Sequence, residues 1–265
     1  MNQATNNEAV QAKALVSAGR VNFNTSVASS YMVSEAFKSL RSNVLFCGTD
    51  IKVILVTSTN ENDGKSTVAT ELAKSLAEIG QKTLLIDADM RKSVILQRNI
   101  KSQNIMGLSE LLSGQAPVEK VVYNTQIPEF DVIFSGQFPP NPVELLSTKK
   151  FKSLLEEFSS VYDYIIIDSP PLAPVIDAAV IATCCDGAIL VVSAGLTRIA
   201  DANNVKQQIL RSGCRILGAV LNESEAKYAR KKYYGRRGYY YYYSYGYGHE
   251  HTKKRGAKKA AKKEK

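Results

Sequence analysis

The sequence predicts an α/β fold with a mostly parallel β-sheet flanked by helices, followed by a disordered Tyr/Lys-rich C-terminal tail. Short β-branched runs alternate with longer amphipathic stretches, and the runs are apolar throughout rather than at every second position. Strands of this kind are typical of a parallel sheet that is covered on both faces. The tail is predicted from composition, because residues 228–247 hold ten of the fourteen tyrosines and have no apolar pattern that could build a core.

The predicted elements alternate along the chain. Helical spacing of Val33, Phe37 and Leu40 predicts a first helix over about 32–46. The predicted strands are 52–58, 83–87, 130–134, 164–168, 188–193 and 216–221. The predicted helices between them are 65–79, 142–159, 175–183 and 200–211. In a sheet of this type the ligand is expected at the carboxyl ends of the strands.

Length and composition divide the chain into three parts. Residues 1–30 are rich in Asn, Ala, Ser and Thr and are predicted to be a flexible N-terminal segment. Residues 31–227 are long enough for one ordinary domain. Residues 228–265 form the flexible, basic, tyrosine-rich tail, with thirteen Lys/Arg and two Glu, a net charge of +11. Since the whole chain carries +9, the part before the tail carries −2, and the basicity belongs to the tail.

Cysteine usage and hydropathy favour a cytoplasmic protein. The four cysteines, Cys47, Cys184, Cys185 and Cys214, form no Cys-x-x-Cys pair, and no signal sequence stands at the N-terminus. The longest apolar region, 174–195, is interrupted by charged residues and glycine, which predicts a helix, a turn and a buried strand rather than a membrane span.

A phosphate-binding loop is predicted between the first strand and the following helix. The strand runs into Thr-Ser-Thr-Asn-Glu-Asn-Asp-Gly-Lys-Ser-Thr, which is a Walker A context although Thr59 stands where the usual first glycine lies. Gly64 lets the backbone approach phosphates, Lys65 is expected to neutralise them, and the Ser66 hydroxyl is expected on Mg²⁺. Asp63 and Thr67 complete the predicted nucleotide-binding loop. The alternative is an ordinary Gly-Lys surface turn.

Acidic residues end two of the apolar strands. Asp87 and Asp89 follow one strand and Asp168 ends another, which puts their carboxylates at the ligand edge of the sheet. Asp168 and Asp89 are candidate Mg²⁺ ligands together with Ser66. If the strand continued through Asp87 and Asp89, they would point to opposite faces, and at most one would face the loop unless the chain had already turned. A helix cap or turn residue is the alternative for any one of these acids.

Several classes of enzyme are excluded by what the sequence lacks. The only histidines, His249 and His251, lie in the tail, so the domain has no His-dependent triad and no His-Glu-x-x-His zinc site. The His-Arg-Asp and Asp-Phe-Gly motifs of eukaryotic-type kinases are absent as well.

These motifs together resemble the bacterial tyrosine kinases (BY-kinases) of capsule and exopolysaccharide synthesis, which are built on the MinD/ParA-like P-loop ATPase fold. The resemblance covers about 34–221 and the character of the tail. Asp87-x-Asp89-x-Arg91 resembles the Walker A′ motif of that family, and the segment 136–146 is similar to another family motif. Asn222 ends a strand that looks like the one whose Asn contacts adenine in related ATPases.

The resemblance implies an activity and its residues. The chain is expected to be a protein-tyrosine kinase that uses ATP and Mg²⁺, with Lys65, Asp87, Asp89 and Asp168 in catalysis and Asp87 helping to activate the tyrosine hydroxyl. Autophosphorylation is expected in the tail, at Tyr233, Tyr234, Tyr239, Tyr240, Tyr241, Tyr242, Tyr243, Tyr245 and Tyr247.

The resemblance also implies self-association and partners. Glu35-x-x-Lys38-x-x-Arg41 resembles the oligomerisation motif of the family, with Lys in place of the first Arg, and suggests a ring-like homo-oligomer. The alternative to an oligomerisation motif is an ordinary charged face of a helix. A separate membrane-anchored activator of the polysaccharide chain-length type is expected to recruit the chain to the inner face of the membrane. The other expected partners are protein substrates with tyrosine.

Two departures and two rivals complete the interpretation. Glu61-Asn62-Asp63 stands where the family commonly has Pro-Gly-Glu, which leaves the rigidity of the loop open. Asn60 stands where MinD/ParA proteins have a signature lysine, which favours the kinase branch over a partition-type ATPase without kinase activity. The Tyr/Arg/Lys/Gly-rich tail could also bind nucleic acid by stacking and charge, but the motifs of the domain favour the kinase.

Overall fold

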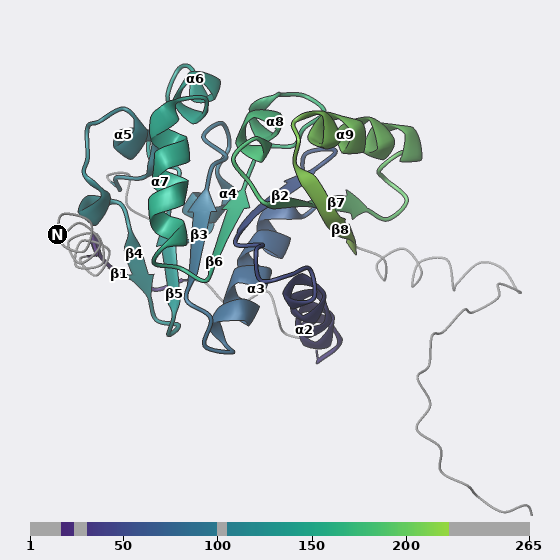
Figure 1. Cartoon of the computed structure of the whole chain (residues 1–265), viewed down its shortest axis with the longest axis horizontal. Coiled ribbons are helices and arrows are strands. Elements are labelled where there is room, and N and C mark those ends of the chain that lie inside the picture. The colour runs from purple at the N-terminus through teal and green to yellow at the C-terminus, as the bar shows by residue number, and fades with distance from the viewer. Residues whose placement is uncertain (1–16, 24–30, 100–104, 223–265) are drawn as a thin grey trace, which may run out of the picture.

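A single eight-stranded β-sheet organises the chain in the computed structural model, which describes residues 17–23, 31–99 and 105–222 (Figure 1). The strand order is β1-β4-β5-β3-β6-β2-β7-β8, and all neighbours are parallel except the antiparallel pair β4 and β5. The strands are β1 (Gly19–Val21), β2 (Val53–Ser58), β3 (Thr83–Asp87), β4 (Tyr123–Thr125), β5 (Phe130–Ile133), β6 (Tyr164–Asp168), β7 (Gly187–Ser193) and β8 (Arg215–Asn222). The predicted mostly parallel sheet is confirmed.

Helices cover both faces of this sheet, as the uniformly apolar strands require. Successive side chains of a strand point to opposite faces, so Leu55 of β2 joins one apolar cluster and Ile54 joins the other. The first cluster includes side chains of α5, α7, α8 and α9, and the second includes side chains of α2, α3 and α4. The helices are α2 (Tyr31–Leu45), α3 (Lys65–Ala77), α4 (Val94–Asn99), α5 (Leu108–Leu112), α6 (Pro142–Leu146), α7 (Lys149–Ser159), α8 (Asp177–Ala182) and α9 (Ile199–Arg211). A 3₁₀ turn spans Val118–Lys120.

The six predicted strands are all present, with ends that differ from the prediction by no more than one residue. The helix predicted over 142–159 is wrong in one respect, because it is two helices. α6 ends at Leu146, and the chain restarts at Thr148, whose hydroxyl accepts a hydrogen bond from the Phe151 N–H at 3.3 Å and caps α7. A threonine N-cap of this kind satisfies a backbone donor that has no partner within the helix.

The N-terminal prediction is wrong for residues 17–23. Gly19–Val21 forms β1, which pairs in parallel with β4, and Phe23 is 3% exposed with its ring 5.3 Å from that of Phe130. The backbone of Phe23 is also held by Gln126, which donates to the Phe23 carbonyl and accepts from the Phe23 N–H, both at 2.6 Å. This segment therefore closes one end of the sheet and belongs to the domain. The rest of 1–30 and the tail 228–265 lie outside the described residues.

The topology brings the carboxyl ends of β2, β3 and β6 together. β6 lies between β2 and β3, and Asp87 pairs in register with Asp168 across β3 and β6. The loop that leaves β2 therefore emerges beside both acidic strand ends. Within the described ranges, no helix is both long enough and apolar enough to cross a membrane.

Candidate active site

The loop between β2 and α3 has the backbone geometry that phosphate binding needs. Gly64 takes φ 93° as it enters α3, and a Cβ at this position would lie 2.0 Å from the Asn222 side-chain nitrogen. Both the left-handed conformation and the close approach require glycine. Asn62 has φ 63°, and asparagine is one of the few other residues that adopts this region readily. Asn62 therefore adopts the left-handed conformation at the position where bacterial tyrosine kinases commonly have glycine.

Asp63 fastens the loop rather than facing a ligand. Its side chain is buried, with one oxygen accepting from the Asn60 N–H at 2.8 Å and the other from the Thr197 hydroxyl at 3.2 Å. The Asn222 amide donates to the Asp63 carbonyl at 3.0 Å. Asp63 was predicted as a residue of the nucleotide-binding loop, and its carboxylate makes hydrogen bonds within the protein. The Asp63 side chain stabilises the loop, which keeps its shape although Glu61 and Asn62 stand where the family commonly has Pro-Gly.

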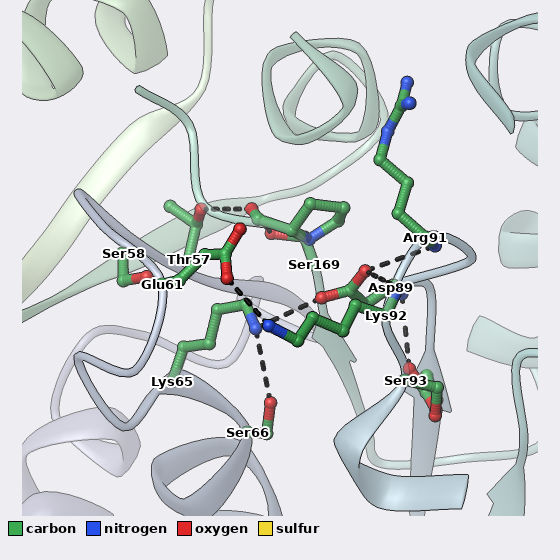
Figure 2. A network of polar contacts seen from close by, with 12 residues as sticks. Thr57, Ser58, Glu61, Lys65, Ser66, Asp89, Arg91, Lys92, Ser93 and Ser169 are labelled. Carbon is green, nitrogen blue, oxygen red and sulfur yellow. Dashed lines mark hydrogen bonds and ion pairs between the residues drawn. The ribbon is translucent and has the colours of Figure 1, made fainter. Parts of the chain in front are cut away.

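The Lys65 side chain forms an ion pair with Asp89. Its Nζ lies 3.2 Å from Oδ2 of Asp89 and 3.4 Å from Oγ of Ser66, and Figure 2 shows these groups pointing toward one another. Burial alone would lower the lysine pKa, but the carboxylates of Asp168 and Asp89 outweigh it and the pKa is raised. Lys65 is therefore a buried, charged ammonium aimed into the site.

Asp87 and Asp168 are both fully buried and lie side by side on adjacent strands. Burial and the neighbouring Asp168 raise the pKa of Asp87 to about 8. The Asp87 carboxylate accepts from the Ser93 hydroxyl and from the Asp89 N–H, the latter at 3.2 Å. Burial likewise raises the pKa of Asp168 to about 6, against the charge of Lys65. Two neighbouring carboxyl groups that are both buried do not readily ionise together unless a cation binds between them.

The chain turns immediately after Asp87, and this turn allows both Asp87 and Asp89 to lie on the side of the phosphate loop. β3 ends at Asp87, and the Ala88 N–H donates to the Asp168 carbonyl at 2.8 Å. Asp89 consequently leaves the strand direction and reaches Lys65. The structure therefore brings Asp87, Asp89 and Asp168 to the same side of the phosphate loop as Lys65.

The residues of the site fit a nucleotide and a divalent cation. Both side-chain oxygens of Asp168 are buried and have no hydrogen-bond partner among the described residues, which is costly unless a cation or its water occupies the space. A cavity of about 320 Å³ lies beside the loop and is lined in part by Lys65, Ser66, Thr67 and Asp89. Hydroxyl, carboxylate and backbone N–H groups are the donor set that Mg²⁺ and phosphates use. The residues present fit both groups.

Some predicted site residues lie elsewhere. Glu35 and Lys38 form an exposed ion pair at 2.8 Å on α2. Arg41 donates to the Ser75 carbonyl of α3 at 2.7 Å and so binds within its own chain. All the tail tyrosines predicted as phosphorylation sites lie outside the described residues.

Other site residues were missed by the sequence interpretation. Arg98 of α4 donates to the Thr67 hydroxyl at 3.2 Å, and Thr197 and Ser93 hold Asp63 and Asp87 as described above. These serine, threonine and arginine positions carry no motif, so nothing in the sequence distinguished them. Asp177 is one of the charged residues that interrupt the apolar region 174–195. A single acid inside an otherwise apolar helix is a signal of a buried ion pair.

Comparisons with known proteins agree with this geometry. Residues 51–209 match the AAA domain family. The tyrosine-protein kinase CpsD of Streptococcus agalactiae is 43% identical over 206 residues, which cover 77% of this chain and 90% of CpsD. The kinase domain of the Escherichia coli tyrosine kinase ETK has a TM-score of 0.69 at 27% identity, covering 88% of this chain and 97% of that one. The septum site-determining protein MinD of Pyrococcus horikoshii, solved with Mg-ADP, has a TM-score of 0.57 at 25% identity, covering 66% and 71%.

The alignment with CpsD spans nearly the whole of that kinase. The likeness to MinD is weaker and reflects the shared nucleotide-binding fold. The chain belongs to the family of bacterial tyrosine-protein kinases built on the P-loop ATPase fold.

Proposed function

We propose that this chain transfers the γ-phosphoryl group of ATP to protein tyrosines, including the nine tail tyrosines named above, and thereby regulates capsular or exopolysaccharide synthesis. The observation that carries the proposal is the grouping of Lys65 with three buried carboxylates at the carboxyl edge of the sheet, in a chain whose tail is a tyrosine cluster. The capsule-related name of a relative, the putative tyrosine-protein kinase CapB of Staphylococcus aureus, supports the pathway.

The residues would divide the work of phosphoryl transfer. Backbone N–H groups at the start of α3 and the Lys65 ammonium would hold the β and γ phosphates. Ser66, Asp89 and Asp168 would hold Mg²⁺, which would neutralise charge on the transferring group. Asp87, fixed by Ser93 and by the Asp89 N–H, would accept the hydrogen bond of the attacking phenol, whose unperturbed pKa is about 10.

Asn222 is proposed to contribute in two ways. Its amide nitrogen holds the phosphate loop through the Asp63 carbonyl. Its position at the end of β8 and on the wall of the cavity also suits the adenine contact that the resemblance implies.

Partners extend the proposal beyond the chain itself. A separate membrane-anchored activator would bring the kinase to the inner face of the membrane, and a ring of copies would let one subunit present its tail to the next. Glu35 and Lys38 are exposed and available for such an interface, whereas Arg41 would have to exchange Ser75 for a partner group. A partition-type ATPase, the rival function, is not favoured, because relatives of high identity are tyrosine kinases.

The test is phosphosite mapping on the purified full chain. The protein is incubated with Mg·ATP, with and without a fragment of a candidate activator, and analysed by mass spectrometry beside Lys65→Met and a truncation after Lys227. Phosphate on tail tyrosines that is lost in Lys65→Met is the expected result. ATP turnover without phosphotyrosine, unchanged by the truncation even with the activator, would instead identify a positioning ATPase.

A further inference from the structure

Two loops carry the acids of the site, and they start side by side. One leaves β3 at Asp87 and the other leaves β6 at Asp168, and these residues are paired in register. The Ala88 N–H donates to the Asp168 carbonyl at 2.8 Å, which extends the pairing one step beyond the strands. The base of each loop is therefore fixed by the sheet.

The same loops meet again at their far ends through an ion pair. Arg91 donates from Nε to Oδ2 of Asp177 at 2.8 Å and from Nη2 to Oδ1 at 3.0 Å. The Asp177 side chain is completely buried, whereas the Arg91 side chain is 41% exposed. A two-point Arg–carboxylate contact defines direction as well as distance. Loss of the Arg91 cation would leave the buried Asp177 carboxylate with an uncompensated charge, so the pair is expected to hold firmly.

The backbone next to this ion pair orients Asp89. The N–H groups of Arg91 and Lys92 both donate to Oδ1 of Asp89, at 3.3 and 3.0 Å. This leaves Oδ2 of Asp89 for Lys65, at 3.2 Å. Figure 2 shows the Arg91 side chain running away from Lys65 while its backbone nitrogen faces Asp89. Residue 91 thus links Asp177, through its side chain, to Asp89, through its main chain.

We propose that Asp177 is a positioning residue for phosphoryl transfer, which holds Arg91 and so fixes the loop that keeps Asp89 beside Lys65. The inference rests on the proposed function, since it assigns Asp89 and Lys65 to the nucleotide. Neither Asp177 nor the Arg91 guanidinium touches the reacting atoms. When the ion pair is lost, the loop from Ala88 to Ser93 keeps its attachment at β3 but loses the one at α8, and the Asp89 carboxylate is no longer directed.

The decisive variants remove one charge at a time. Asp177→Asn keeps the shape of the side chain and Arg91→Gln keeps most of its length, and the double variant removes the pair. We expect each single variant to weaken the Kd for a fluorescent ATP analogue with Mg²⁺ by about 10-fold or more, the usual range for residues that orient a ligand-binding group. The double variant should be no worse than the worse single one, because both changes break the same link. Kinetics of tail phosphorylation should show a matching loss in kcat/KM.

A matched control separates positioning from general stability. Glu71 is another buried acid, and it is paired with Lys74 at 2.8 Å within α3. Glu71→Gln should lower the melting temperature but leave the nucleotide Kd within about twofold of wild type. Arg91→Lys keeps a cation beside Asp177 without the fork, so it should stay folded and still weaken binding. All assays run below the melting temperature of the least stable variant.

Two results would overturn the proposal. The first is an unchanged nucleotide Kd and kcat/KM in folded Asp177→Asn and Arg91→Lys. The second is a Kd effect in Glu71→Gln as large as that in Asp177→Asn, which would reduce the ion pair to ordinary stabilisation. Because the Kd measurement needs no acceptor tyrosine, wild type that binds nucleotide with the expected variant pattern but makes no phosphotyrosine would support the positioning role and refute only the kinase function.

Discussion

The side-chain amide of Asn222 lies against Gly64, so the end of β8 rests directly on the phosphate loop. Its nitrogen donates to the Asp63 carbonyl at 3.0 Å, and a Cβ at Gly64 would come within 2.0 Å of that same nitrogen. Two segments 158 positions apart in sequence are thus packed without room for a methyl group. The shape of the loop depends on β8 as well as on its own sequence.

Gly64→Ala should abolish tight nucleotide binding. The substitution meets both the amide of Asn222 and the left-handed φ of 93°, which costs an alanine about 1–2 kcal/mol. We expect nucleotide affinity, measured by calorimetry, to fall at least tenfold. Gly80→Ala is the control, because Gly80 has φ 82° but nothing within 4 Å of a Cβ. It should lose about 1 kcal/mol of stability and keep its affinity; equal losses of affinity in the two variants would show that the contact with Asn222 is unimportant.

Thr197→Val should loosen the phosphate loop from the other side. The Thr197 hydroxyl accepts from the Ser193 N–H at 3.0 Å and donates to the buried Asp63 carboxylate at 3.2 Å. Valine has the same shape but neither bond, and a hydrogen bond to a charged group contributes about 1.5–3 kcal/mol. Urea unfolding should show a loss of that order, accompanied by weaker nucleotide binding. Thr183→Val, at an exposed position, should stay within about 0.5 kcal/mol of wild type. Wild-type affinity in Thr197→Val would mean that Asn60 alone holds Asp63.

The parts of the fold that could be predicted are those with a local pattern. β2, β3 and β6 are mostly apolar and buried along their whole length, and the Gly-Lys-Ser sequence marks the loop that follows the first of them. β1 and β4 have three residues each, too few to show a period. They form because β1 pairs with β4 and β4 pairs with β5. The break at Thr148 was visible as a threonine before a helical run, but the longer apolar period concealed it.

The charged residues of the site could be predicted from the sequence, but the contacts between them could not. Lys65 was expected in the phosphate loop and Asp87, Asp89 and Asp168 at strand ends. The turn at Ala88 that brings Asp89 to Lys65, however, depends on a hydrogen bond to the neighbouring strand. The fastening of Asp63 likewise depends on Thr197, which is 134 residues away. Contacts of this kind follow from the order of strands in the sheet, and a single sequence does not contain that order.

Tyr162→Phe should change stability in a pH-dependent way. The buried Tyr162 hydroxyl donates to Oδ2 of Asp131 at 2.8 Å, and burial together with that carboxylate raises the tyrosine pKa far above its usual value. At pH 7 the variant should be about 1.5 kcal/mol less stable, because it loses one hydrogen bond to a charged group.

Above pH ~10 the stability difference between wild type and Tyr162→Phe should shrink. In the unfolded wild type the phenol ionises near pH 10, whereas the folded form keeps its proton, so wild-type stability falls by about 1.4 kcal/mol per pH unit from this one group. The phenylalanine variant lacks that term, so the difference should shrink and then disappear near pH 11. Denaturant unfolding at pH 7 to 11 tests this; a constant difference across the range would mean that the hydroxyl is not protected from ionisation.

Asp168→Asn should separate stability from cation binding. Both oxygens of the Asp168 carboxylate are buried without a partner in the described part of the chain, beside Asp87 on the next strand. Removing this charge should leave the melting temperature of the nucleotide-free protein equal or higher, because a carboxylate buried beside the like charge of Asp87 disappears. ADP with Mg²⁺ should raise the wild-type melting temperature by mass action, less so in EDTA, whereas in Asp168→Asn the Mg²⁺-dependent part should vanish.

Asp186→Asn is the control for Asp168→Asn, because it should lower stability without changing the effect of Mg²⁺. The Asp186 carboxylate lies at the other end of the strands and accepts from the N–H groups of Lys52 and Val53, at 2.9 and 2.7 Å. Its loss of charge should lower stability by about 1–3 kcal/mol and leave the Mg²⁺-dependent rise intact. A protein in which Asp168→Asn melts well below wild type yet keeps the Mg²⁺ effect would place the cation elsewhere and make Asp168 a structural acid.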